Sequence, residues 1–402
     1  MPLASQIPLI HFVIKIPVRE KAQVACRSMQ RLSTRLAFLA AGMGTSAWAA
    51  LVPFAKSRMA LESSELGLLL LFLGMGSIVA MPAAGMLASR FGCRTVILSS
   101  GAFSCLVLPF LAMASSTLLL ALALFLFGAA IGTLDVSMNI QAVMVEKTHG
   151  GALMSGFHGL FSVGGFIGAG GMALFLWTGL SPLAACVIVA ASIGGVLCWG
   201  APHLLRAPAV LEETHPYFAV PHGTVIFIGI LCFIVFLAEG AMLDWSALLL
   251  STDGLLTANE GGLGYAVFAV AMTIGRLTGD RVVRYWGRRR VMVLSGLCAA
   301  AGFFTAVLAP VSGIALVGFL LIGAGASNIV PILFTAAGRQ KDMPAGMAIS
   351  AITTVGYAGI LAGPALIGFV AHASSLHLAF GGLGFAMLLV AATSRLYLVL
   401  QT

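Results

Sequence analysis

The residues best placed to do chemistry lie in one apolar run, Gly128 to Gln141, which carries a single carboxylate, Asp135. Because an α-helix turns by about 100° per residue, four residues of this run share one narrow stripe: Gly128, Gly132, Asp135 and Asn139. A charge in the middle of a bilayer costs at least about 3 kcal/mol, so in a membrane this stripe must face a cavity or a partner helix. A carboxylate placed there can load and release a proton. The alternative is a permanently protonated acid that donates a hydrogen bond to another helix, for example to Asn328.

Four further charged residues lie well within apolar runs: Glu239, Asp244, Arg276 and Asp280. Arg276 and Asp280 are four residues apart, so we expect a structural ion pair along one helix near a cytoplasmic gate. The alternative is an arginine that holds an anionic substrate. Asp244 and its neighbour Trp245 fall at the end of their run, where an interfacial tryptophan is ordinary, and contact of Asp244 with a solute is the other interpretation.

Uncharged polar side chains extend this set of candidates. His158 and Ser162 share a helix face, and a histidine both donates and accepts hydrogen bonds and can relay protons. Thr354 and Tyr357 are expected on the opposite wall of the same cavity. Asn139 and Asn328 are further candidates, and for these and His158 the alternative is that they only join helices together.

Composition places these residues in a membrane protein. Of the 402 residues 60% are hydrophobic and 8% charged, against about 25% charged in soluble domains, and the mean hydropathy is +1.07. The net charge of +8 comes from cations in short loops, so nucleic acid is not an expected partner. The seven cysteines form no CxxC pair and predict neither a disulfide framework nor a metal site. A nucleotide-binding glycine loop and an HExxH motif are missing, so neither an enzyme nor a cofactor is expected.

Apolar runs long enough to span a bilayer number twelve. They cover roughly 34–54, 65–88, 95–114, 117–142, 152–178, 182–203, 222–244, 260–283, 291–309, 313–336, 344–371 and 376–398. Eighteen of the 21 lysines and arginines fall on the side of the N-terminus, which places both termini in the cytoplasm of a multi-pass protein of the bacterial inner membrane. Residues 1–33 are expected to be a cytoplasmic tail, with a true start at Met29 as the alternative.

An internal repeat divides the chain into two halves. Phe38-Leu-Ala-Ala-Gly42 recurs as Phe236-Leu-Ala-Glu-Gly240, and other matches have similar separations of 192 to 198 residues. The sequence therefore predicts six helices in residues 34–203, a cytoplasmic linker at 204–221, and six helices of the same topology in 222–402. Glu239 and Asp135 each have an apolar counterpart in the other half, so we expect them to form an asymmetric proton-coupling pair.

The segment Gly85-Met-Leu-Ala-Ser-Arg-Phe-Gly-Cys-Arg94 resembles the signature loop of the major facilitator superfamily. The resemblance implies a fold of two six-helix repeats with a substrate site between them near the midplane. It also implies gate or structural roles for a set of residues in the two copies of the loop: Gly85, Arg90, Gly92, Arg94 and Gly287. Ser89 stands where the family usually has an aspartate that latches the outward-facing state, so a latch here must be rebuilt, for example from Asp280.

Three stretches together resemble the YbjJ-like branch of that family, near the fucose permease group: Phe157 to Gly165, Ala238 to Trp245 and Ile274 to Gly279. Resemblance to the fucose permease group implies proton-coupled uptake of a small neutral sugar, with a carboxylate in the fourth helix where Asp135 lies. The expected partners are therefore a small solute, protons and the lipid bilayer, for a monomeric symporter. The alternatives are a proton-driven exporter of drugs or metabolites, and a membrane sensor that transports nothing.

Overall fold

The computed structural model describes residues 18–206, 221–252, 255 and 262–399, and every regular element in these ranges is a helix. The first half comprises α1 (Val18–Arg58), α2 (Ser63–Phe91), α3 (Cys93–Met113), α4 (Thr117–His149), α5 (Met154–Trp177), α6 (Pro182–Gly200) and the 3₁₀ turn η1 (Ala201–His203). The second half comprises α7 (Thr224–Thr252), α8 (Gly262–Trp286), α9 (Arg288–Val307), α10 (Ser312–Ala326), α11 (Ile329–Ala337), α12 (Ala345–Ala373) and α13 (Leu376–Val399). Twelve helical segments of the described chain are long and apolar enough to cross a membrane, which confirms the predicted fold class.

Several helices extend beyond the apolar runs from which they were predicted. α1 begins at Val18, inside the segment 1–33 expected to be a tail, and residues 1–17 lie outside the described residues. α4 continues to His149, seven residues past its apolar run, and ends on Gly150 in the left-handed conformation. Of the predicted linker 204–221, residues 207–220 lie outside the described ranges. Apolar runs predict which segments lie in the hydrocarbon, whereas helices continue into the interface until a cap ends them.

The tenth span differs from the single helix expected at 313–336, because α10 ends at Ala326 and α11 begins at Ile329. Pro331 explains the break. A proline has no N–H to donate to the carbonyl four residues earlier, here that of Ser327, and its ring crowds that carbonyl. The Asn328 amide occupies the gap and donates to the Gly275 carbonyl at 3.2 Å and to the Ser327 hydroxyl at 2.9 Å.

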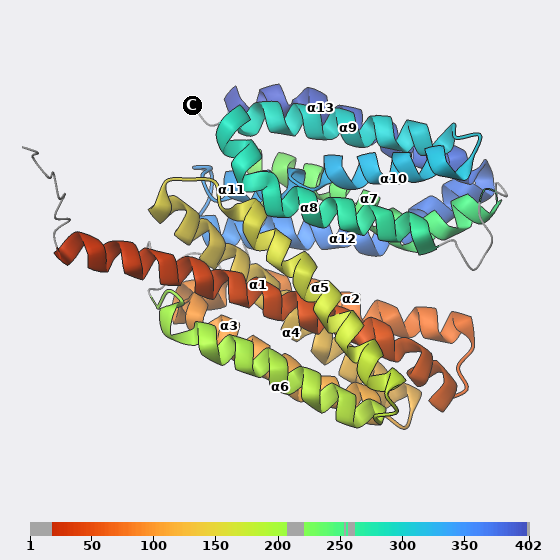
Figure 1. Cartoon of the computed structure of the whole chain (residues 1–402), viewed down its shortest axis with the longest axis horizontal. Helices are drawn as coiled ribbons and strands as arrows, with labels where there is room; N and C mark the ends of the chain where they lie inside the picture. The colour runs from red at the N-terminus through yellow and green to blue at the C-terminus, as the bar shows by residue number, and fades with distance from the viewer. Residues whose placement is uncertain (1–17, 207–220, 253–254, 256–261, 400–402) are drawn as a thin grey trace, which may run out of the picture.

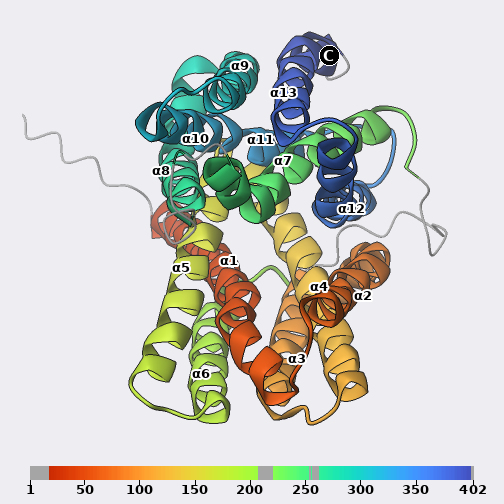
Figure 2. The ribbon, with the colours of Figure 1, turned by 90° about the vertical axis from the view of Figure 1, so that its right-hand side faces the viewer.

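The two halves repeat the same packing (Figures 1 and 2). In the first half α1 packs on α5, α2 on α4 and α3 on α6, and in the second α7 packs on α12, α8 on α10 and α9 on α13. Gly92 and Gly287 occupy equivalent turns, before α3 and α9, with φ of 82° and 80°. Few side chains other than hydrogen tolerate this conformation, so both copies of the loop require glycine. The halves meet along two seams, α2 against α12 and α5 against α8.

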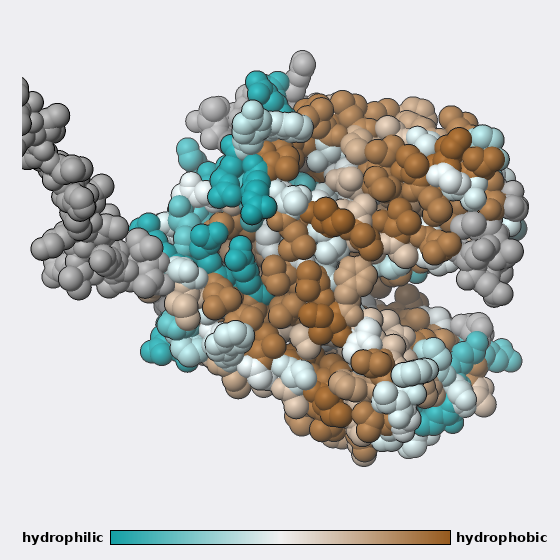
Figure 3. Space-filling model, viewed as in Figure 1, coloured by the Kyte–Doolittle hydropathy of each residue, from teal (hydrophilic) through white to brown (hydrophobic). Residues whose placement is uncertain are grey.

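The two ends of the bundle differ. Hydrophilic residues gather at one end, which we call the arginine-rich end; it carries the loops after α2, α4, α8 and α11. At the opposite end, where α1 and α7 finish, a wedge-shaped opening separates the halves (Figure 3). The halves are therefore closed together at the arginine-rich end and parted at the other.

Candidate functional site

Asp135 lies on α4 with its side chain 8% exposed, and its neighbours are polar but uncharged. Its Oδ1 accepts a hydrogen bond from the Asn139 amide at 3.4 Å, and the hydroxyl of Tyr357, on α12 of the other half, is a second partner. In the part of the chain that the structure describes, no lysine, arginine or histidine pairs with Asp135. This carboxyl group therefore sits where the two halves meet, without a counter-charge.

The stripe that carries Asp135 packs through its glycines. A side chain at Gly128 would come within 1.9 Å of the Leu73 carbonyl oxygen, and one at Gly132 within 2.9 Å of the Ser77 Cα. The glycines thus let α4 approach α2 closely, while the polar end of the stripe turns to the second half. Asn139 donates to the Asp135 carbonyl at 2.9 Å, and its own side-chain oxygen is buried without a partner.

Glu239 on α7 forms an ion pair with Arg276 on α8, with 3.1 Å between Oε1 and Nη2. The same guanidinium donates through Nη1 to the Ser162 hydroxyl at 3.1 Å. Ser162 lies on α5, so this central polar cluster of Ser162, Glu239 and Arg276 crosses between the halves. Arg276 is 6% exposed and its Nε has no hydrogen-bond partner.

The predicted ion pair between Arg276 and Asp280 is wrong. Arg276 turns to Glu239 and Ser162, and the Asp280 carboxylate instead lies against the backbone N–H of Gly156, in the first turn of α5. Positions four apart can always meet along a helix, but in a dry interior each charge takes the partner that satisfies it best. The expected pairing of Asp135 with Glu239 is not formed either, since no hydrogen bond or ion pair joins these two described residues.

His158 lies on α5 between aromatic rings from both halves. Its ring centroid is 5.3 Å from that of Phe38 on α1 and 5.6 Å from that of Phe334 on α11, both edge-on. Its Nε2 is buried without a partner, and its carbonyl accepts from Ser162 at 3.3 Å. His158 thus neighbours the central polar cluster through Ser162.

The other predicted cavity residues are dispersed. Asp244 is exposed near the outer end of α7. Asn328 bonds within the second half, at the break of the tenth span, rather than to Asp135. Thr354 lines a cavity of about 130 Å³ at the seam of α2 and α12, together with Pro82 and Ser350. The structure therefore joins Tyr357, but not Thr354, to the acid on α4.

The residues expected at the gate divide in the same way. A side chain on Gly85 would come within 2.9 Å of the Gly346 carbonyl oxygen, so this glycine closes the seam between α2 and α12. Arg90 and Arg94 make their contacts inside the first half: the Arg90 guanidinium stacks on the Phe91 ring at 5.3 Å, and the Arg94 N–H donates to the Leu205 carbonyl. Ser89 bonds back to the Met86 carbonyl of its own helix.

Glu146, which the sequence did not single out, holds the arginine-rich end together. It lies in the last turn of α4, 2% exposed, and its Oε2 accepts the backbone N–H groups of Leu153 and Met154 at 2.8 and 3.0 Å. Its Oε1 accepts from Thr335 on α11 at 2.9 Å and from Arg288 on α9 at 3.3 Å. An acid in the last turn of a helix opposes the helix dipole, and this exception was the signal in the sequence.

Twelve spans in two repeated halves, with buried charges at the seams and an opening at one end only, define a class of protein: polytopic helical transporters. The Major Facilitator Superfamily model matches residues 36–339, more than half of the chain. The chain belongs to the Major Facilitator Superfamily, whose members are transporters and not enzymes.

Relatives and solved structures agree with this assignment. The chain is 54% identical over 368 residues to an uncharacterized MFS-type transporter of Yersinia pestis, covering 91% of this chain and 95% of that one. It is 34% identical over 357 residues to the membrane protein MosC of Rhizobium meliloti, covering 88% and 85%. The E. coli fucose:proton symporter FucP in outward conformation matches with a TM-score of 0.73 at 17% identity, covering 92% and 98%. The proton:xylose symporter XylE matches with a TM-score of 0.72 at 12% identity, covering 92% and 96%.

Proposed function

We propose that this transporter couples the inward movement of protons to the uptake of a small, polar, sugar-like solute by alternating access. The observation that carries the proposal is Asp135, a buried carboxyl group without a cationic partner among the described residues, whose hydroxyl partner Tyr357 belongs to the other half. When the halves move apart there, the acid exchanges a protein hydroxyl for water. Loading and release of a proton are thereby tied to the conformational state.

The charges at the centre favour a neutral solute. Arg276 is compensated by Glu239, so its guanidinium is not free to hold an anion in this state. Ser162, Glu239 and His158 then supply hydroxyl, carboxylate and imidazole groups, which suit a ligand rich in hydroxyl groups. The two symporters that share the fold carry a sugar with protons, which supports this choice and the proposed place near the fucose permease group, in the YbjJ-like branch.

The moving bodies in this proposal are residues 34–203 and 222–402, joined by the linker 204–221, in the inner membrane of a bacterium. At about 2.3 kcal/mol per charge per 100 mV, one proton moving inward can concentrate a neutral solute more than tenfold. The opening at the end away from the arginines is the state that accepts the solute from outside.

The test is uptake by proteoliposomes of a panel of neutral monosaccharides and amino sugars, with and without an imposed pH gradient. For a solute that the wild type accumulates, Asp135→Asn should keep exchange of labelled for unlabelled solute but lose accumulation, so that the internal concentration stops at the external one. Asp244→Asn removes an exposed carboxylate and is the matched control, expected to accumulate normally. Unchanged accumulation by Asp135→Asn would remove Asp135 from the mechanism, and proton-driven efflux of the panel by the wild type would favour an exporter.

A further inference from the structure

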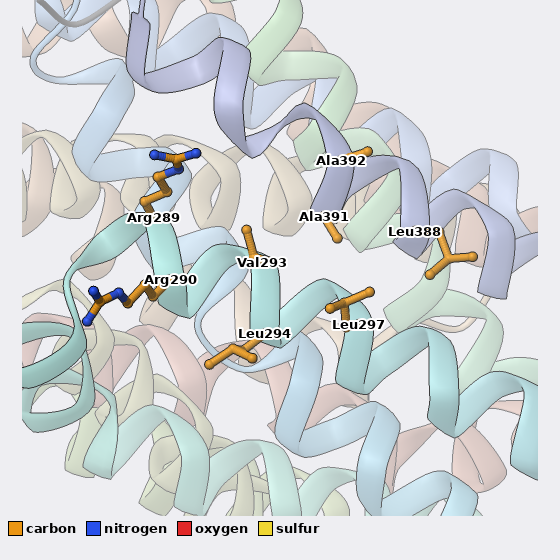
Figure 4. Close-up of a pocket in the computed structure, with 8 residues that line it drawn as sticks. All are labelled: Arg289, Arg290, Val293, Leu294, Leu297, Leu388, Ala391 and Ala392. Atoms are coloured by element: carbon orange, nitrogen blue, oxygen red, sulfur yellow. The ribbon is translucent and has the colours of Figure 1, made fainter.

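A groove runs along the outer surface of the second half, between α9 and α13, away from the seams of the two halves (Figure 4). Its walls are Val293, Leu294 and Leu297 of α9 and Leu388, Ala391 and Ala392 of α13. The volume is about 760 Å³, within the range of about 300–1,000 Å³ typical of ligand sites. Apart from two arginines at one end, every residue that lines the groove is aliphatic.

Small residues create the groove. A side chain at Gly296 would come within 2.9 Å of both the Ala391 Cβ and the Met387 carbonyl oxygen, so α9 and α13 touch at this point. Beside the contact, α13 presents Ala391 and Ala392, which leave space where larger side chains would fill it. Leu294 and Leu297 remain 47% and 46% exposed along the opening, and in a bilayer that exposure is to hydrocarbon.

Arg289 and Arg290 stand at the polar end of the groove (Figure 4). Both are exposed, and within the described ranges neither forms a hydrogen bond or an ion pair, whereas the adjacent Arg288 pairs with Glu146. Three consecutive arginines in the first turn of a helix also repel one another and the positive end of its dipole. An anion at this position would relieve that repulsion.

The depth of the arginines matches that of lipid headgroups. Tyr285 and Trp286, 86% and 47% exposed, immediately precede the turn at Gly287, and exposed aromatic residues of this kind mark the boundary between hydrocarbon and water. The arginines follow the boundary at the arginine-rich end, and the aliphatic walls continue from them along the spans. Headgroup charge and acyl chain are thus both complemented in one direction.

We propose that the groove between α9 and α13 binds an anionic phospholipid of the cytoplasmic leaflet, with its phosphate at Arg289 and Arg290 and an acyl chain along the aliphatic walls. Basic pockets between helices on the cytoplasmic side bind such headgroups. The site is independent of the solute pathway, because none of its lining residues belongs to the central polar cluster or to the Asp135 neighbourhood.

The experiment is native mass spectrometry of the purified protein titrated with phosphatidylglycerol, and separately with zwitterionic phosphatidylcholine. The wild type should retain phosphatidylglycerol preferentially. The double variant Arg289→Gln, Arg290→Gln should retain it about tenfold more weakly or worse, because each basic residue contributes about 1 kcal/mol of attraction to anionic lipid. Ala392→Phe fills the groove at an exposed position and should also weaken retention while both arginines remain.

The matched control is Arg281→Gln, Arg284→Gln, which removes the same charge from exposed positions on α8 that do not line the groove. It should retain phosphatidylglycerol like the wild type. Equal losses in the two double variants would show general attraction to a basic surface and overturn the site. Equal retention of the two lipids by the wild type, or full retention after the Arg289 and Arg290 substitutions, would overturn it as well.

Discussion

Glu239 and Asp135 are both acids inside the helical bundle, but their partners differ. Glu239 faces a guanidinium at 3.1 Å, whereas Asp135 faces a phenol and an amide. Ion pairs in a dry interior become costly when one partner is lost, because the remaining charge has no solvent to stabilise it. A neutral or protonated partner for Tyr357 carries no such cost. The two acids are therefore suited to different tasks, Glu239 to holding a charged cluster and Asp135 to changing its proton.

A double-mutant cycle tests the ion pair. We expect Glu239→Gln and Arg276→Met each to destabilise the protein by about 3 kcal/mol, since each leaves the other residue buried and unpaired. The double variant should be less destabilised than the sum of the two, by roughly 1–3 kcal/mol. Thermal unfolding in detergent measures all three, with Ser162→Ala as the control that removes one hydrogen bond and leaves the pair. Strictly additive effects would show that the pair is not energetically coupled.

The importance of Asp135 could be inferred from sequence, because a lone acid in an apolar run needs a reason to be there. The partner of Arg276 could not. Spacing along one helix suggested Asp280, but α7 and α5 bring Glu239 and Ser162 closer, and that arrangement depends on how three helices cross. Glu146 was missed because it lies where an apolar run ends and looks like an ordinary interfacial residue.

At the scale of elements, α5 is the helix that both halves hold by its N-terminus. Glu146 accepts its first N–H groups from within the same half, and Asp280 lies against Gly156 from the other. The free N–H groups at a helix start carry partial positive charge and bind anions. With Ser89 turned back on its own helix, the acids that close this end act at the seam of α5 and α8 rather than at that of α2 and α12.

The start of α7 shows the same principle outside the membrane spans. The Asp342 carboxylate accepts the N–H of Thr224 at 2.7 Å and its hydroxyl at 2.6 Å, and these hydrogen bonds hold the pKa of Asp342 below its ordinary value. A carboxyl group whose pKa is lower in the folded state stabilises the fold above its unfolded-state pKa. That contribution is lost as the pH falls through the folded-state value.

We therefore expect Asp342→Asn to lower the unfolding temperature at pH 7, and the difference from wild type to shrink as the pH is taken below about 4, the ordinary range for aspartate. Thermal unfolding in detergent across that range measures both effects. Thr224→Val removes the hydroxyl donor but keeps the backbone N–H, so it should lie between the two proteins. A difference that grows on acidification would contradict the assignment.

The helical elements themselves were largely predictable, because hydrocarbon thickness fixes the length of an apolar run and the repeat supplied independent matches. What escaped was local backbone geometry. The break between α10 and α11 could have been expected at Pro331, yet proline is often tolerated in membrane helices, and only the surrounding contacts of Asn328 show how the freed groups are satisfied.

At the scale of the whole molecule, the protein is closed at the arginine-rich end and open at the other, and the Glu146 cluster of Glu146, Leu153, Met154, Arg288 and Thr335 ties the halves in that state. Division into halves and their orientation follow from the repeat and from the placement of lysine and arginine. Which end is closed does not, because both states share one sequence and differ only in the contacts between the halves.

Arg288→Gln tests the tie. It removes the ion pair to Glu146 but leaves the hydrogen bonds from Leu153, Met154 and Thr335. Because Arg288 is partly exposed, we expect a loss of about 1 kcal/mol, or roughly a fivefold shift toward the state open at the arginine-rich end.

Thiol labelling of Gly346→Cys, in a background without the native cysteines, reports that shift, since Gly346 faces Gly85 across the seam and has room for a side-chain carbon. Labelling should be faster with Arg288→Gln than without it. Arg281→Gln, at an exposed position on α8, is the control that should leave the labelling rate unchanged. A rate unaffected by Arg288→Gln would show that the closure does not depend on this pair.

The burial of Glu146 has a consequence for the cell interior. Dissolved ions screen exposed charge pairs beyond about 8 Å at physiological ionic strength, but they reach a carboxylate that is 2% exposed only poorly. Closure at the arginine-rich end should therefore be nearly independent of cytoplasmic salt. A bacterium that accumulates ions during osmotic stress would keep the same balance between the two states of this transporter.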